Sequence, residues 1–281
     1  MDDDTKYVLE GRKTFFIVPD VTLFPDTYLE DYLTHGYETY IINDDRTCPL
    51  TKKIEAIISV FNDAIFFFYI DTPIQGIEWR DYISELQEEY GDKILIGVLY
   101  AKRSTEIEKR SLERYYLFDV GIKCGCISLE YSKAKNFTLI DKVMFANQAC
   151  GRRKNVRAIC DSTSSVNLTY KKKKYFGAVS DVSLSHFSCV FNYELDVPMF
   201  EKLYDVVVDI HGMHFKTDSI LLDVRELSDR KLYIFIFSQP NGQPGMDPDL
   251  SQRLSEKIYK LVTDKVQTLL HTMFIEASKS S

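Results

Sequence analysis

The chain has 281 residues, of which 45% are hydrophobic and 13% aromatic, values typical of a globular protein with room for more than one core. Its formal net charge of -7 argues against a general nucleic-acid-binding protein. The charge is unevenly spread, because residues 1–149 carry 26 acidic and 17 basic side chains, whereas residues 150–281 carry 16 and 18. We therefore expect two domains of different electrostatic character.

No segment of the sequence has the pattern of a targeting or membrane-crossing element. The first residues, MDDDTKYVLEG, have neither the basic start nor the apolar core of a secretory signal. The apolar run AIFFFYI at residues 64–70 is too short to cross a bilayer. We expect a cytoplasmic protein that does not insert into a membrane.

The six cysteines are expected to be reduced and buried, because they lie mostly in apolar segments of a chain without a secretory signal. They stand at positions 48, 124, 126, 150, 160 and 189. The sequence CGC at 124–126 has no matching second pair, and His211 and His214 have no third ligand nearby in the sequence. We therefore expect no metal site.

The first half of the chain alternates short apolar runs with amphipathic segments, which predicts alternating strands and helices. Pro49 suits the first turn of one helix, and Gly36 suits the position after the end of another. Trp79 is expected to pack a helix onto the sheet. The expected strands are 14–18, 37–43, 64–70, 93–101 and 123–130, and the expected helices are 25–36, 48–61, 77–91, 104–121 and 132–151.

Five strands separated by helices predict a doubly wound parallel sheet with helices on both faces. We place this α/β domain at residues 1–131 and treat the helix at 132–151 as a connection to a second domain. Ligands of such sheets bind at the carboxyl ends of the strands, where Asp20 follows the first strand and Asp71 the third. The order and length of the elements resemble a response-regulator receiver domain over about residues 12–149.

The resemblance to a receiver domain implies acidic residues after the first strand and a phospho-accepting Asp after the third, and Asp20 and Asp71 stand at these places. It also implies a Thr or Ser after the fourth strand and a Lys after the fifth. The sequence has Tyr100 or Ala101 at the first of these two places and Glu130 at the second. We therefore expect a degenerate receiver-like domain that is not phosphorylated. Alternatively, the two aspartates cap helices or turns.

From residue 152 onward the apolar pattern changes to short alternating runs separated by turn residues, which predicts antiparallel strands. Six such strands are expected to close into a small barrel. The sequence PNGQPGMDPD at 240–249 predicts a loop, and the amphipathic segment 250–270 predicts a terminal helix. We place this barrel domain at residues 152–281.

The barrel domain opens on a cluster of cations whose mutual repulsion indicates an anionic partner. The cluster consists of Arg152, Arg153, Lys154 and Arg157. Within it, RKNVR fits the RxxxR motif of PilZ domains, and DVSLSH at 181–186 fits their (D/N)xSxxG motif except at the last position. Residues 150–272 resemble a PilZ domain in the spacing of these motifs, the six-strand pattern and the helix that follows.

PilZ domains are receptors for cyclic di-GMP, a bacterial second messenger with two phosphodiester charges and two guanines. The resemblance implies that Arg153 and Arg157 bind phosphate and guanine, because a guanidinium can bind phosphate through two parallel hydrogen bonds and can stack on a purine. It implies that Asp181 and Ser183 bind the polar edge of a guanine.

Two further positions affect the predicted site. His186 takes the place of the final motif glycine, and we expect its ring to lie in the site, where it either crowds the ligand or stacks on a guanine. Arg152 directly precedes the first motif, and the resemblance then implies a stacked, intercalated pair of ligand molecules. The alternatives are that the arginine segment is a solvated linker and that residues 181–183 form an ordinary turn.

We expect a receptor that couples cyclic di-GMP binding to a rearrangement of its domains and to an interaction with a downstream protein, with Gly151 as a hinge. The sequence contains no P-loop, nucleophile elbow or zinc-hydrolase motif, so we expect neither an enzyme nor a cofactor other than this ligand. One alternative is a PilZ-like adaptor that no longer binds ligand. A second is a nucleic-acid-binding barrel that uses YKKKKY at 170–175, although a solvated hairpin tip is the favoured interpretation of that sequence.

Overall fold

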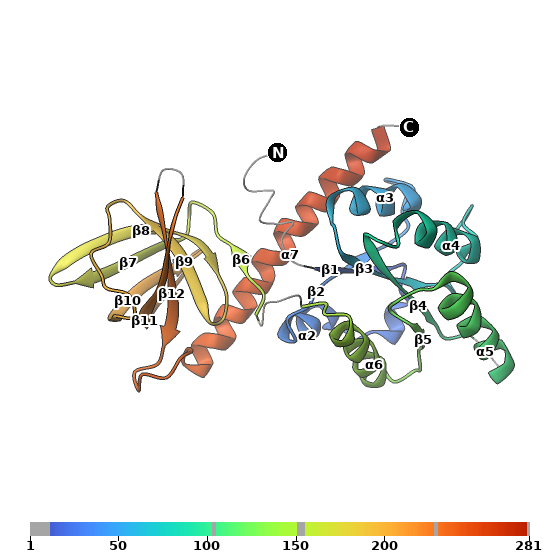
Figure 1. The fold of residues 1–281 in the computed structure, drawn as a ribbon, viewed down its shortest axis with the longest axis horizontal. Helices are drawn as coiled ribbons and strands as arrows, with labels where there is room; N and C mark the ends of the chain where they lie inside the picture. Colours follow the sequence, from blue (N-terminus) through green and yellow to red (C-terminus); the bar gives the residue numbers. More distant parts are fainter. Residues whose placement is uncertain (1–11, 103–104, 151–154, 228–229, 280–281) are drawn as a thin grey trace. The chain divides into compact units, whose positions relative to one another are not determined.

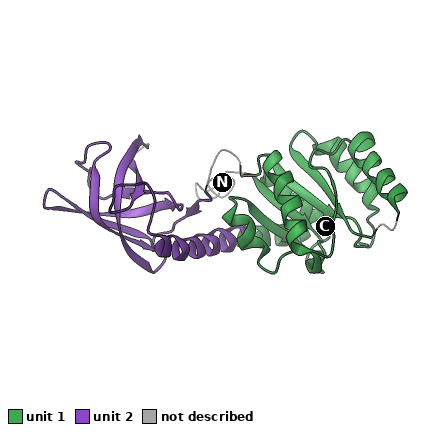
Figure 2. Ribbon diagram, turned by 90° about the horizontal axis from the view of Figure 1, so that it is seen from below, with its two compact units in different colours: residues 1–154, 267–281 green, residues 155–266 purple. Residues whose placement is uncertain are grey.

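The computed structural model describes residues 12–102, 105–150, 155–227 and 230–279. The chain forms two compact units, of which the first comprises residues 1–154 and 267–281 and the second residues 155–266 (Figure 2). The C-terminal helix α7 therefore contributes residues to both units.

The first unit is built on a parallel sheet with strand order β2-β1-β3-β4-β5. This order is the doubly wound arrangement shared by flavodoxin-like and receiver folds. It confirms the predicted parallel α/β fold. The elements are β1 (Lys13–Ile17), η1 (Val21–Leu23), α2 (Tyr28–Thr34), β2 (Glu38–Ile42), α3 (Leu50–Val60), β3 (Ala64–Tyr69), α4 (Trp79–Tyr90), β4 (Ile94–Tyr100), α5 (Glu106–Arg114), η2 (Tyr115–Val120), β5 (Cys126–Ser128) and α6 (Lys133–Ala146).

Both faces of this sheet are covered, with α2 and α6 on one side and α3 and α4 on the other (Figure 1). Successive strand residues point to opposite faces, so neighbouring phenylalanines of β1 enter different cores. Phe16 stacks on Tyr32 of α2, with ring centroids 5.7 Å apart. The ring centroid of Phe15 lies 5.5 Å from that of Phe61, the C-cap residue that follows α3. Continuous apolar strands thus follow from burial on both faces.

The helix α6 is part of the core of the first unit. Its residues Ile140 and Met144 are fully buried in the same cluster as Phe16 and Tyr32. The helix ends at Ala146, five residues before the expected end at Gly151, which lies outside the described residues.

The expected helix 104–121 is divided into two segments of different winding. Thr105 and Glu108 form a capping box at the start of α5, which fixes its first turn. At Tyr115 the chain continues as the π-helix η2, which ends where Gly121 adopts a left-handed conformation with φ of 78°. Trp79 contacts the sheet as expected, with its ring 5.9 Å from that of Phe68.

The second unit is a closed antiparallel barrel, as predicted. Its strands follow the order β8-β7-β10-β11-β12-β9, and β9 pairs with β8 to close the ring (Figure 1). The two-residue strand β6 pairs with the last two residues of β8. The elements are β6 (Ala158–Ile159), β7 (Ser165–Tyr170), β8 (Lys173–Val182), β9 (His186–Phe191), β10 (Lys202–Ile210), β11 (Met213–Glu226), β12 (Lys231–Ser238) and α7 (Pro248–Lys279).

The barrel interior is filled by aromatic and aliphatic side chains. Phe187 of β9 stacks on Phe235 of β12, with ring centroids 5.1 Å apart and ring planes 14° from parallel. Leu254 and Ile258 of α7 belong to the same buried cluster, so the predicted terminal helix completes the barrel core.

Among the helices that the structure describes, none combines the length and the apolar character that a bilayer crossing requires. None of the six cysteines forms a disulfide bond, and Cys126, Cys150 and Cys160 are only partly buried, in contrast to the expected burial. Within the described residues, no three His, Cys, Asp or Glu side chains are grouped so as to hold a metal ion.

Candidate functional site

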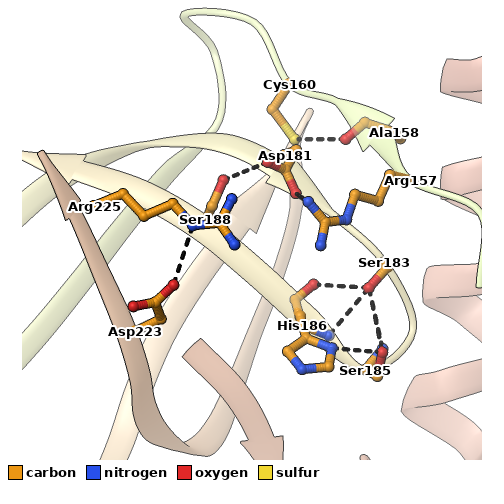
Figure 3. Close-up of polar contacts among 10 residues, drawn as sticks. All are labelled: Arg157, Ala158, Cys160, Asp181, Ser183, Ser185, His186, Ser188, Asp223 and Arg225. Atoms are coloured by element: carbon orange, nitrogen blue, oxygen red, sulfur yellow. Dashed lines mark hydrogen bonds and ion pairs between the residues drawn. The ribbon is translucent and has the colours of Figure 1, made fainter. Parts of the chain in front are cut away.

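The short strand β6 brings the arginine segment against the second motif. Ala158 pairs with Val182 and Ile159 with Asp181, so the chain just before β6 runs beside the C-terminal end of β8. Arg157, the residue before this strand, places a guanidinium nitrogen 3.5 Å from a carboxylate oxygen of Asp181 (Figure 3). Two residues 24 positions apart in the sequence are thereby neighbours, one from each predicted motif.

Asp181 is held on its other side by a serine that sequence reasoning missed. Ser188 of β9 pairs with Asp181 across the hairpin, and its hydroxyl donates a hydrogen bond to Asp181 Oδ2. Ser188 is almost fully buried, whereas Asp181 and Arg157 remain partly exposed. The carboxylate is therefore fixed in direction while part of it faces solvent.

The turn between β8 and β9 is organised by Ser183. Its backbone N–H donates to the carbonyl of His186 at 2.8 Å, and its hydroxyl accepts from the His186 N–H at 3.1 Å. The Asn155 side chain donates to Ser185 Oγ at 3.0 Å, which ties the arginine segment to the turn. Ser183 is buried, and its hydroxyl already makes hydrogen bonds within the turn. The contact of this hydroxyl with a guanine stays a prediction.

His186 occupies the place of the motif glycine without backbone strain. It begins β9 and pairs with Ile236 of β12, so its backbone is extended and does not need the left-handed conformation that favours glycine. Its Nδ1 lies 2.7 Å from Ser185 Oγ. Burial, and next the positive charge of Arg157, lower the pKa of the imidazole. The ring is therefore neutral at physiological pH.

The lowered pKa of His186 predicts a loss of stability in mild acid. His186 binds a proton less readily in the folded protein than in the unfolded chain, where it titrates at about pH 6.5. Protonation of His186 therefore does not affect the free energy of unfolding above that pH, and it lowers this free energy as the pH falls through it. We expect the Tm of the wild type to fall more between about pH 8 and pH 5 than that of His186→Gln, because glutamine does not titrate in this range.

Thermal unfolding of both proteins at matched ionic strength measures this difference. The other histidines are common to both chains, so their contributions cancel in the comparison. Identical pH profiles would show that His186 titrates equally in the folded and unfolded states.

Two of the predicted ligand residues, Arg152 and Arg153, lie outside the described residues. The structure brings together Arg157, Asp181, Ser183 and His186 (Figure 3). Sequence reasoning missed Ser188, although a serine within the apolar sequence HFSCVF interrupts the apolar pattern.

The lysine run lies at the tip of the β7–β8 hairpin, as predicted. Lys171 and Lys172 form the turn, both with positive φ, and Lys171 lies over the ring of Tyr170. Tyr175 is buried in the barrel core and does not offer a free face for stacking on a base. The tip therefore lacks one of the two aromatic platforms that a nucleic-acid site here requires.

Asp20 and Asp71, the two aspartates that stand at the receiver-like positions of the first unit, have backbone partners. Asp20 caps η1, with its carboxylate accepting from Thr22 N at 3.0 Å and from Thr22 Oγ1 at 2.7 Å. Asp71 Oδ2 accepts from the backbone N–H groups of Ala101 and Lys102, at 2.6 and 2.7 Å. Asp71 thus holds the chain that leaves β4.

We expect Asp71 to remain unmodified when the protein is incubated with acetyl phosphate and Mg²⁺. A phosphoryl group adds negative charge that must be offset by a metal and a cation. Asp71 Oδ2 is instead occupied by two amide donors, and Glu130 stands at the expected lysine position, paired with Lys135.

Intact-mass measurement, with a functional receiver domain treated in parallel as a positive control, tests the prediction. A phosphoryl adduct that peptide mapping places on Asp71 would show a working receiver.

No family model and no curated protein matches the sequence. Among solved structures, the chain is similar to the PilZ domain of YcgR from Escherichia coli with cyclic di-GMP, at 14% identity and a TM-score of 0.36, covering 42% of this chain and 97% of that chain. It is similar to YcgR from Escherichia coli in complex with cyclic di-GMP, at 14% identity and a TM-score of 0.37, covering 42% and 49%. It is also similar to the MrkH–cyclic di-GMP complex of K. pneumonia, at 12% identity and a TM-score of 0.35, covering 42% and 54%. The chain thus spans about half the length of the last two.

In fold and in motif the second unit resembles PilZ domains. It has the closed six-stranded barrel, the terminal helix and the paired motif residues that the resemblance implies. The first unit has the strand order of a receiver domain.

Proposed function

We propose that this protein is a receptor for cyclic di-GMP and not an enzyme, and that the ligand binds on the outer face of the barrel beside β6. The observation that carries the proposal is the pairing of Arg157 with Asp181, which joins the RxxxR segment to the (D/N)xSxxG segment. A guanidinium and a carboxylate side by side match a ligand that has both anionic phosphodiesters and guanine N–H donors.

The geometry of the pair supports this role. At 3.5 Å the contact between Arg157 and Asp181 is longer than a direct charge-assisted hydrogen bond, so neither group is committed to the other. Ser188 keeps the carboxylate oriented, which lowers the entropic cost of ordering it around a ligand. We propose that Arg153 and Arg157 bind phosphate and guanine, that Asp181 binds the guanine edge, and that Ser183 and His186 shape the turn below it.

The receptor would act on a downstream protein through its two-unit construction. The helix α7 supports the proposal, because it contributes Leu254 and Ile258 to the barrel core while Phe274 lies under the ammonium group of Lys53 in the first unit. One continuous helix thus takes part in both units, and a shift of the helix in the barrel can change its packing in the first unit.

Isothermal titration of the full chain with cyclic di-GMP tests the proposal, with cyclic di-AMP as the matched control ligand. We expect saturable binding of cyclic di-GMP and much weaker binding of cyclic di-AMP. A stoichiometry of two supports the intercalated pair predicted from Arg152, whereas a stoichiometry of one excludes it. If neither nucleotide binds in titration or in equilibrium dialysis, the proposal fails and the adaptor alternative takes its place.

A further inference from the structure

On the outer face of the barrel, a row of paired residues continues from Asp181 across three neighbouring strands. Asp181 pairs with Ser188, Ser188 with Ile234, and Ile234 with Asp223, so these residues form one row across β8, β9, β12 and β11. Paired residues of antiparallel strands share a face of the sheet. A β-bulge after Leu221 places Asp223 in this row.

Arg225 lies two residues beyond Asp223 on β11 and therefore points to the same face. Figure 3 shows its side chain extending from β11 toward Ser188, while the side chain of Arg157 extends toward Asp181 from the opposite end of the row. The two guanidinium groups approach the same stretch of surface from opposite sides. Across three interstrand spacings the row spans about 14 Å, a width that two arginine side chains can bridge with a nucleotide between them.

The local partner of Arg225 does not account for this placement. Its Nε lies 3.1 Å from Asp223 Oδ2, but the Arg225 side chain is 63% exposed. An exposed ion pair of this kind contributes little to stability, so a structural role alone does not explain it. Each guanidinium has one carboxylate neighbour in the row, Asp181 for Arg157 and Asp223 for Arg225. A guanidinium has five N–H donors, so each keeps donors that an anion between them can accept from.

We propose that Arg225 is a ligand-binding residue that contacts the phosphodiester of cyclic di-GMP farther from Arg157. This inference rests on the proposed function and adds a fourth strand, β11, to a site that the sequence motifs confine to the β6–β8–β9 corner. The guanidinium binds the phosphate through two parallel N–H donors, and Asp223 orients it through Nε.

The test compares Arg225→Ala and Arg225→Lys with Lys216→Ala by calorimetry with cyclic di-GMP. Lys216 is a matched control, because it is an exposed cation on the same strand, beside Asp205, and stands nine residues away. We expect Arg225→Ala to weaken binding about fivefold to thirtyfold, and Arg225→Lys to weaken it less, since lysine keeps the charge but loses the fork. Lys216→Ala should bind as the wild type does. Thermal unfolding should give the same Tm for all four proteins.

The outcomes separate this inference from the function on which it rests. If Arg225→Ala binds as tightly as the wild type while Arg157→Ala does not, Arg225 is not a ligand contact and the receptor function stands. Equal weakening in Arg225→Ala and Lys216→Ala would reduce the effect to net charge and also overturn the inference. If the wild type does not bind, the receptor function itself fails.

Discussion

Replacement of Arg157 by alanine is expected to weaken cyclic di-GMP binding about tenfold to a hundredfold, and Arg153→Ala is expected to do the same. Each change removes a charge-assisted, bidentate contact worth roughly 1.5–3 kcal/mol. The fold should be unaffected by Arg157→Ala, because this side chain is partly exposed and the Asp181 carboxylate keeps its hydrogen bond from Ser188.

Calorimetry with cyclic di-GMP, together with thermal unfolding, distinguishes a binding role from a structural one. Lys216→Ala serves as the control for the loss of one positive charge from the barrel. Unchanged affinity in both arginine variants would contradict the assignment of the RxxxR motif. A lowered Tm for Arg157→Ala would indicate that the Arg157–Asp181 pair stabilises the barrel instead.

The sequence predicted the architecture of both units because their cores impose strong apolar periods. Phe15 and Phe16 are neighbours that enter opposite cores, so both positions must be apolar and β1 is recognisable as a strand buried on two faces. The ends of elements were less predictable. Local hydrogen-bond donors and acceptors determine these ends, as Thr105 and Glu108 do at the start of α5.

The end of the same helix illustrates what a 3.6-residue period does not reveal. The apolar residues of 104–121 fit one helix, yet from Tyr115 the chain winds as a π-helix. The π-winding buries Tyr116, while Phe118 remains largely exposed. The first residue of this π-helix contacts α4, where the guanidinium of Arg80 lies 3.8 Å from the ring centroid of Tyr115, a tertiary contact that the apolar period does not encode.

The candidate site was predictable to the extent that it follows motifs. Arg157 and Asp181 were selected from motif spacing, and the structure shows them as neighbours. Ser188 and Arg225 were not selected, because their place beside Asp181 depends on strand register and on the β-bulge after Leu221. Neither the register nor the bulge has a distinct signal in the sequence.

Asp181 has the most specific role proposed for any residue of the site, because guanine and adenine differ at the edge that it would contact. Guanine presents N–H donors there, which a carboxylate accepts, whereas adenine presents a different pattern of donors and acceptors. The Ser188 hydroxyl donates a hydrogen bond to the carboxylate, so the direction of the Asp181 side chain is set before a ligand arrives.

Asp181→Ala is therefore expected to weaken cyclic di-GMP binding by about tenfold or more and to reduce the preference over cyclic di-AMP. Asp181→Asn, which keeps an acceptor oxygen, should retain most of the binding. Ser188→Ala is the matched control, because it removes the supporting hydrogen bond but leaves the carboxylate in place, and it should have a smaller effect. Titration of each variant with both nucleotides gives the selectivity directly. If Asp181→Ala still rejects cyclic di-AMP as strongly as the wild type does, another group reads the base, and Asp181 serves only to position Arg157.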